Sequence, residues 1–153
     1  MKIKTSVKKS LIKPLECIDK KKDIWKLRWD IQDGSFEQIQ LDHKPSLIEI
    51  KDIIHSWYNN LIENNIIYGF KWKGMRVCLS KENQSNYLLF EETDLFPIEL
   101  KFGTWDEPVF YLIETSEELK EFKKAISEHI KQCLQLGWTM KKGIDWSIYD
   151  VSK

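Results

Sequence analysis

Apolar and polar residues alternate in two runs near the start of the chain, at residues 25–31 and 36–41. Alternation with a period of two is typical of a β-strand with one buried face. Asp33-Gly34 lies between the runs and favours a two-residue turn with positive φ at both positions. The pattern therefore predicts a β-hairpin over residues 25–41.

Two later segments have helical periodicity, with apolar residues three and four positions apart. They predict two main amphipathic helices, at about residues 46–64 and 116–136. Asn64-Asn65 is expected to end the first helix, because asparagine accepts the left-handed conformation of a helix C-cap. Thr115, with a glutamate three residues later, has the pattern of a capping box that starts the second helix. Gly137 is expected to end it.

Two further hairpins and a short helix are predicted between and beside these helices. Residues 67–79 have strand chemistry around a tight turn at Lys73-Gly74, and Ser80 can cap a short helix that follows. Residues 98–102 and 109–113 pair as the last hairpin. The predicted strands are joined by tight hairpin turns, whereas parallel strands would need long crossover connections. The predicted fold class is therefore α+β, an antiparallel sheet of β-hairpins with the two main helices packed against it.

Charge is unevenly distributed along a chain of 153 residues whose net charge is zero. Residues 1–23 carry eight lysines against three acidic residues, a net charge of +5. We therefore predict a basic, extended N-terminal arm at residues 1–23, with residues 11–17 as a candidate strand, and a single α+β domain at residues 24–153 that ends in an aromatic tail. Lys8, Lys9 and Lys13 are candidates for contact with an anionic partner or an acidic neighbouring subunit, the alternative being a solvated tail. Overall neutrality argues against a dedicated nucleic-acid-binding protein.

Motifs for catalysis, cofactor binding and metal binding are missing from the sequence. The histidines His43, His55 and His129 do not combine with a cysteine into a zinc-binding pattern. A phosphate-binding glycine loop and a serine-nucleophile motif are also missing. The three cysteines are far apart and form no CxxC pair, which argues against a disulfide framework. We therefore predict no catalytic residue, no metal site, no cofactor and a protein that is not an enzyme.

No apolar run approaches the roughly 20 residues that cross a bilayer, so we expect no membrane partner.

The tryptophan content indicates contact with a partner. Seven tryptophans occur in the chain, and large aromatic side chains stabilise interfaces as well as cores. Trp105 lies in a predicted hairpin turn, where there is little core to enter. Together with Trp138, Trp146 and Tyr149 of the tail, it is a candidate interface residue.

Three stretches carry a family resemblance: FKWKGMRVCLSKENQSNY at residues 70–87, PIELKFGTWDEPVF at residues 97–110 and GWTMKKGIDWSIY at residues 137–149. They resemble small uncharacterised proteins encoded by phages and prophages of gut Bacteroides, including crAss-like phages. Those proteins are distantly similar to a domain of phage tail-fibre proteins. The resemblance implies that seven motif residues shape the domain: Trp72, Gly74, Asn83, Gln84, Tyr87, Phe102 and Gly103.

The resemblance implies a non-enzymatic virion structural protein, an oligomeric adaptor or a component of a head or tail fibre. Its expected partners are further copies of itself, as a dimer or trimer, and other phage structural proteins of the fibre, capsid or tail. It is expected in the virion, and in the host cytoplasm during assembly. Two alternatives stay open: a fibre-assembly accessory protein absent from the mature virion, and an early phage protein that binds nucleic acid through the basic arm.

Overall fold

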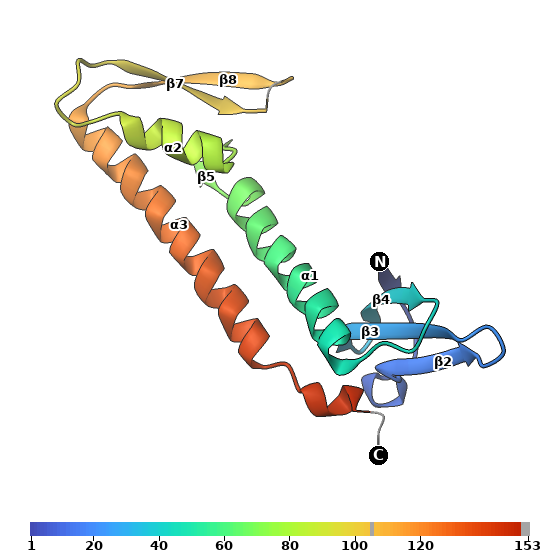
Figure 1. Cartoon of the computed structure of the whole chain (residues 1–153). Helices are drawn as coiled ribbons and strands as arrows, with labels where there is room; N and C mark the ends of the chain where they lie inside the picture. The colour runs from blue at the N-terminus through green and yellow to red at the C-terminus, as the bar shows by residue number, and fades with distance from the viewer. Residues whose placement is uncertain (105, 151–153) are drawn as a thin grey trace. The chain divides into compact units, whose positions relative to one another are not determined.

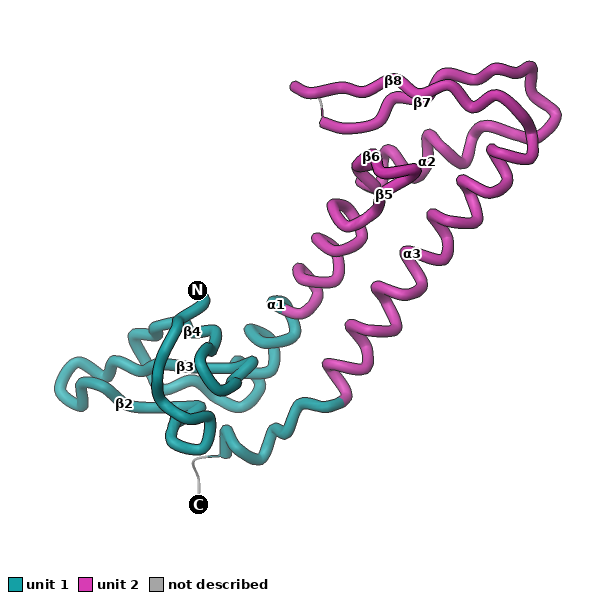
Figure 2. Tube along the Cα trace, turned by 180° about the vertical axis from the view of Figure 1, so that it is seen from behind, with its two compact units in different colours: residues 1–57, 143–153 teal, residues 58–142 magenta. Residues whose placement is uncertain are grey.

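A computed structural model describes residues 1–104 and 106–150 of the chain. It confirms the α+β class, since the described residues form three α-helices, a four-stranded antiparallel sheet and two separate two-stranded hairpins (Figure 1). The chain divides into two compact units: unit 1 is residues 1–57 with 143–153, and unit 2 is residues 58–142 (Figure 2). The sequence had led us to expect one domain after an arm.

Unit 1 contains the four-stranded sheet, with the strand order β1-β4-β3-β2. Its strands are β1 (Lys2–Lys4), β2 (Leu15–Asp19), β3 (Ile24–Gln32) and β4 (Ser35–Leu41). β3 and β4 are the first predicted hairpin, which is confirmed. In its turn only Gly34 has a positive φ, at 95°, so the expectation of a positive φ at Asp33 was wrong. Asp30 takes a positive φ of 48° instead, where the register between the two strands shifts.

Residues 1–23 are built into this sheet and do not form an arm apart from it. β1 pairs with β4, and β2 pairs with β3, where Leu15 lies opposite Leu27. A short 3-10 helix, η1 (Lys9–Leu11), connects the two strands. Arg28 of β3 donates to the Lys13 carbonyl at 3.0 Å and to Glu16 Oε2 at 2.9 Å. The hydrogen bond from Arg28 lowers the pKa of the Glu16 carboxyl.

The first turns of α1 (Leu47–Tyr68) and the C-terminal tail complete unit 1. Ile50 and Ile54 are each 1% exposed, and the ring of Trp57 lies edge-on to Trp29 of β3 with centroids 6.2 Å apart. The tail forms a 3-10 helix, η2 (Trp146–Tyr149), whose buried Tyr149 hydroxyl donates to the Arg28 carbonyl at 2.7 Å. The two ends of the chain therefore contribute to one core.

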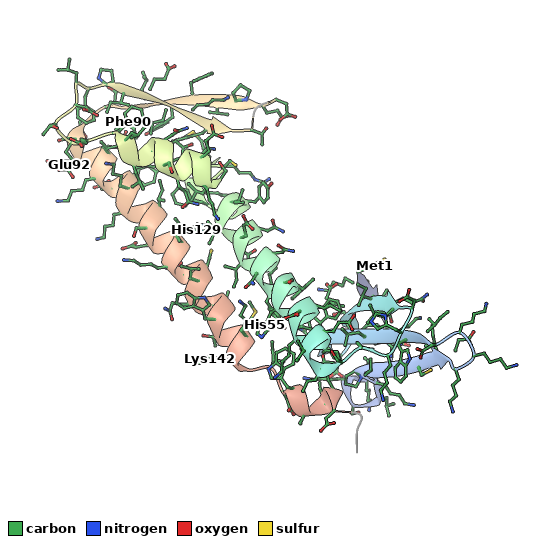
Figure 3. All side chains as sticks on the ribbon, viewed as in Figure 1. Met1, His55, Phe90, Glu92, His129 and Lys142 are labelled. Carbon is green, nitrogen blue, oxygen red and sulfur yellow. The ribbon has the colours of Figure 1, made fainter. Side chains whose placement is uncertain are left out.

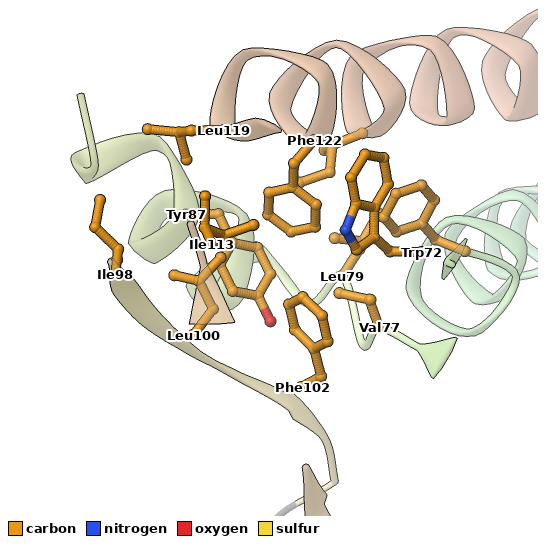
Figure 4. Packing of buried hydrophobic residues seen from close by; sticks show 12 residues of the cluster. Trp72, Val77, Leu79, Tyr87, Ile98, Leu100, Phe102, Ile113, Leu119 and Phe122 are labelled. Carbon is orange, nitrogen blue, oxygen red and sulfur yellow. The ribbon is translucent and has the colours of Figure 1, made fainter. Parts of the chain in front are cut away.

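Unit 2 is organised around Phe122 of α3 (Ser116–Lys142). The other elements of unit 2, besides the end of α1, are β5 (Lys71–Trp72), β6 (Met75–Arg76), α2 (Lys81–Leu89), β7 (Ile98–Gly103) and β8 (Pro108–Ile113). The fully buried Phe122 ring contacts the rings of Trp72, Tyr87 and Phe102 at centroid distances of 5.4, 5.4 and 5.5 Å (Figure 4). Strands and helices of this unit therefore share one aromatic core.

Both long helices continue past their expected ends. α1 runs to Tyr68, and His129 of α3 lies beside its last turn (Figure 3), with Nε2 3.1 Å from the carbonyl oxygens of Asn65 and Ile66. α3 runs to Lys142, and Gly137 is a buried helical residue in contact with Ile62 of α1. The predictions that Asn64-Asn65 and Gly137 end the helices were therefore wrong.

The expected helix starts are confirmed in unit 2. Thr115 Oγ1 accepts from the Glu118 amide at 3.1 Å, and the Glu118 carboxylate accepts from the Glu114 amide at 3.3 Å. Ser80 Oγ accepts from the Asn83 amide at 3.1 Å. Side-chain oxygens thus bind amides that have no partner within a first helical turn.

Candidate assembly surface

The β7–β8 hairpin of unit 2 has one face in the core and one face outside it. In its register, Leu100 lies opposite Tyr111, Lys101 opposite Phe110 and Glu99 opposite Leu112. Side chains of neighbouring strand residues point to opposite faces. Ile98, Leu100 and Phe102 are buried, so Lys101 and Glu99 lie on the outer face together with Phe110 and Leu112. The hairpin thus presents two apolar side chains beside two charged ones.

β8 is the most apolar exposed strand of unit 2. Phe110 is 60% exposed, Leu112 is 45% exposed, and Val109 near the hairpin tip is 44% exposed. β8 contains no charged residue and pairs on one side only, with β7; in the part of the chain that the structure describes, no strand occupies its other edge. An open strand edge with exposed apolar side chains and no charge is a template for pairing with another chain. We refer to Val109, Phe110 and Leu112, with this open edge, as the β8 surface.

Three of the motif residues bind backbone carbonyl groups of unit 2 through their side chains. Asn83 Nδ2 donates to the Cys78 carbonyl at 2.8 Å, and Gln84 Nε2 donates to the Leu79 carbonyl at 2.7 Å. Tyr87 donates its hydroxyl to the Lys101 carbonyl of β7 at 2.7 Å. Burial raises the pKa of Tyr87 to about 12, so this hydroxyl keeps its proton across the physiological range. Asn83 and Gln84 thus hold residues 78 and 79 against the first turn of α2, and Tyr87 holds β7 against α2.

The other four motif residues shape the backbone or the core of the same unit. Trp72 and Phe102 are buried next to Phe122. Gly74 follows Lys73 in the β5–β6 turn, where both have a positive φ, of 81° and 48°. Gly103 ends β7 with a φ of 78°, and a Cβ at this position would lie 2.5 Å from the Glu107 carbonyl oxygen. All seven motif residues therefore lie in unit 2.

A polar cluster ties the inner face of β8 to the first turn of α3. Lys73 Nζ donates to Glu118 Oε2 at 2.6 Å, and the Tyr111 hydroxyl donates to the same oxygen at 3.2 Å. The hydrogen bond from Lys73 lowers the pKa of Glu118, and the same contact raises the pKa of Lys73. The Tyr111 ring stacks on Phe102 with centroids 5.4 Å apart. The inner face of β8 is therefore held by Glu118 and Phe102, while its outer face remains exposed.

A groove of about 850 Å³ lies between α2 and β7. Asn83 and Tyr87 line it, and both donate to backbone carbonyl groups within the unit. Cys78 also lines the groove, as a free and partly buried thiol. Among the described residues, no three side chains of His, Cys, Asp or Glu are arranged to hold a metal ion. In the same described ranges, no helix is both long and apolar enough to cross a membrane.

The interface candidates chosen from sequence have different surroundings. Trp138 of α3 is 48% exposed and is available for a partner. Tyr149 is 3% exposed, so its selection as an interface residue was wrong: it belongs to the core of unit 1. Trp146 packs within the same unit, 5.3 Å from the His55 ring. Trp105 lies outside the described residues.

The lysine candidates are all exposed and lie between β1 and β2 of unit 1. Lys8 precedes η1, Lys9 begins it, and Lys13 follows it. The backbone amide of Lys9 donates to Asp33 Oδ1 at 2.7 Å, which fixes this connection against the β3–β4 turn. These lysines are therefore carried by an ordered connection of the sheet.

Sequence reasoning did not single out Val109, Phe110 and Leu112. The available signal was the run of five consecutive apolar residues at positions 109–113. A strand with one buried face needs an apolar residue only at every second position. Such a run places apolar side chains on both faces of a strand, and here only one face meets the core of unit 2. Comparison of the chain with protein-family models, with curated proteins and with solved structures finds no match.

Proposed function

We propose that this protein is a non-enzymatic structural subunit of a phage particle, an oligomeric adaptor or a component of a head or tail fibre, and that the β8 surface is its main interface. The observation that carries the proposal is the open, uncharged edge of β8 with Phe110 and Leu112 exposed beside it. The resemblance of residues 70–87 and 97–110 to small phage-encoded proteins supplies the setting.

The apolar area of the β8 surface suits a contact in which a few residues supply most of the binding energy. Complete burial of a Phe or Leu side chain is worth about 1.5–3 kcal/mol. Phe110 and Leu112 are roughly half exposed, so covering both contributes about 1.5–3 kcal/mol per chain. Hydrogen bonds to the open edge add to this contribution, and backbone pairing of this kind is a common way for one protein to bind another.

The groove side of the hairpin supports a structural role over a catalytic one. The side chains with polar groups in the motif, Asn83, Gln84 and Tyr87, each donate to a carbonyl of their own unit. A catalytic group needs to reach a substrate atom, whereas these side chains of α2 bind the carbonyl groups of residues 78 and 79 and of Lys101 in β7. The motif thus builds the support on which β8 is presented.

The proposal is tested in particles of the phage that encodes the chain. Mass spectrometry of purified particles should detect the protein in several copies, and Phe110→Lys should reduce its incorporation. Ile48→Lys is the matched control, because Ile48 is 74% exposed on α1 of unit 1 and lies outside the β8 surface. A chain that co-purifies with fibre proteins from lysate but is absent from the particles would instead identify an assembly accessory protein. Equal incorporation of both variants would overturn the role of β8.

A further inference from the structure

We propose that β8 pairs with β8 of a second copy of this chain, antiparallel and with the two Tyr111 residues opposite each other, so that the two hairpins form one four-stranded sheet. This inference rests on the proposed function and names the partner of the β8 surface. The β7–β8 hairpin already packs on the core of unit 2, and this pairing would extend its two strands to four, a common sheet size.

The hydrogen-bonding pattern inside the hairpin shows which groups of β8 face its open edge. Pro108 has no N–H and lies opposite Gly103, so this pair cannot exchange two hydrogen bonds. Pairs in an antiparallel ladder alternate between bonded and non-bonded, which makes Lys101–Phe110 a non-bonded pair as well. Consistently, the Lys101 carbonyl is bound from the α2 side, by Tyr87. The N–H and C=O groups of Phe110 and Leu112 therefore face the open edge.

Two copies of one strand can pair only in registers that place a residue opposite itself, because neighbouring residues direct their backbone groups to opposite edges. Centring on Tyr111 sets Phe110 opposite Leu112 twice, and all their N–H and C=O groups are paired. Centring on Phe110 sets Leu112 opposite Pro108, which has no N–H for the Leu112 carbonyl. Centring on Leu112 sets Phe110 opposite Glu114, whose N–H already donates to Glu118 Oε1 at 3.3 Å. The Tyr111 register is therefore favoured.

The side chains are complementary in the same register. Each outer row of the four-stranded sheet runs Lys101, Phe110, then Leu112 and Glu99 of the second copy, following the pairing within each hairpin. Four apolar side chains meet at the centre, and every row has a lysine at one end and a glutamate at the other. No like charges face each other across the new contact, which removes the repulsion that opposes many strand pairings. Val109 is set opposite Ile113 of the second copy.

The other open edges of the chain carry charges that discourage such pairing. The edge strand β1 of unit 1 has Lys2 and Lys4 among its three residues, and the edge strand β2 has Glu16 and Asp19 among its five. Charged side chains on an edge are a common device against pairing with a second chain. β8 has none. Self-association is therefore expected through β8 and not through the four-stranded sheet.

The register is tested by oxidising cysteine variants. Residues facing each other in an antiparallel pair have Cα atoms about 4.5–5.5 Å apart, which suits a disulfide. Tyr111→Cys should form a disulfide-linked homodimer. Phe110→Cys and Leu112→Cys should not cross-link alone, but a mixture of the two variants, distinguished by a mass tag, should give the mixed dimer. The unmodified chain, with Cys17, Cys78 and Cys133, gives the background.

The mixed pair keeps the test independent of Tyr111, whose hydroxyl contacts Glu118. Homodimers of Phe110→Cys without the mixed dimer would overturn the Tyr111 register. Sedimentation of the full chain should show a concentration-dependent dimer or higher oligomer, with the dissociation constant raised at least about tenfold by Phe110→Lys and unchanged by Ile48→Lys. A chain that stays monomeric and forms no cross-link would overturn self-pairing, while its detection in particles would leave the structural role standing.

Discussion

Single side chains in unit 2 replace the hydrogen bonds that a strand partner would supply. Residues 77–80 follow β6 without belonging to a strand, and the carbonyl groups of Cys78 and Leu79 are bound by the side-chain amides of Asn83 and Gln84. Both amides come from the first turn of α2, which Ser80 caps. The sequence LSKENQ therefore folds back on itself, so the cap and the two carbonyl contacts depend on the same turn.

Replacing Asn83 by alanine should destabilise unit 2. The part-buried Cys78 carbonyl would lose its partner, and loss of such a hydrogen bond costs about 0.5–1.5 kcal/mol. Urea unfolding measures the loss. Asn86→Ala on the same helix is the control, because Asn86 is exposed and its removal should change the free energy of unfolding by less than about 0.5 kcal/mol. Equal effects of the two variants would contradict the role of the Asn83 contact.

The Lys73–Glu118 contact predicts a pH dependence of stability. The hydrogen bond from Lys73 lowers the pKa of Glu118 from its ordinary value of 4.5. The contribution of Glu118 is therefore present above pH 4.5 and is lost as the pH falls through the lowered pKa of the folded state. Thermal unfolding between pH 3 and pH 7 should show a smaller acid-induced decline in Tm for Glu118→Gln than for the unchanged chain. Parallel declines would show that Glu118 contributes nothing to it.

At the scale of elements, the helices are longer than their sequences predict because they pack on each other. Along α1 and α3, Asn59 contacts Lys141, Ile62 contacts Gly137, and the carbonyl of Asn65 contacts His129, an antiparallel arrangement. Gly137 lets α3 approach Ile62, so a residue that normally ends a helix is kept inside one. Burial against a neighbouring helix outweighs the propensity cost of about 1 kcal/mol.

A double-mutant cycle tests this close approach. Gly137→Ala should lower the free energy of unfolding by about 1–2 kcal/mol, because its Cβ would overlap the buried Ile62 side chain. In an Ile62→Ala background the same change should instead stabilise the protein by up to about 1 kcal/mol, since alanine is the better helix former. Urea unfolding of the four proteins gives the coupling energy. Additive effects would show that the two positions are independent.

At the scale of the whole molecule, unit 1 is discontinuous in sequence. Residues 143–150 return to the sheet formed by the first 41 residues, and Tyr149 donates to the carbonyl of Arg28 while Trp146 packs on His55. Unit 2 is a continuous segment with its own aromatic core. Stability can therefore be changed in one unit without the same change in the other, which is a measurable property of this architecture.

Tyr149→Phe should loosen unit 1 and leave unit 2 unchanged. The Arg28 carbonyl would lose its hydrogen bond, at a cost of about 1–3 kcal/mol. Hydrogen–deuterium exchange followed by mass spectrometry should show faster exchange in peptides covering β3 and β4, with no change in peptides covering β7 and β8. Tyr68→Phe is the control, because Tyr68 is 66% exposed. Faster exchange throughout the chain would indicate that the two units unfold together.

Part of the proposed site could be read from the sequence. The motif residues Asn83, Gln84 and Tyr87 were identified through the resemblance, although their carbonyl partners were not. The apolar run at residues 109–113 was recognised as a strand, but its exposed face was not. A strand that is apolar on both faces can have its second face covered by a partner or exposed to solvent. The sequence of the strand does not distinguish these two cases. Tyr149, chosen for an interface, is buried because Arg28 lies far from it in sequence and next to it in the fold.

The sequence by itself determined the local elements: the three hairpins, the helix starts at Ser80 and Thr115, and the α+β class. These depend on periodicity, turn residues and caps within a few positions of one another. Tertiary structure decided that the helices continue through Asn64-Asn65 and Gly137, which strands residues 1–23 pair with, and that β8 keeps an open edge. Each of these depends on contacts between residues distant in sequence. Backbone N–H and C=O groups are the same in every strand, so the sequence of a strand does not specify which strand it will pair with.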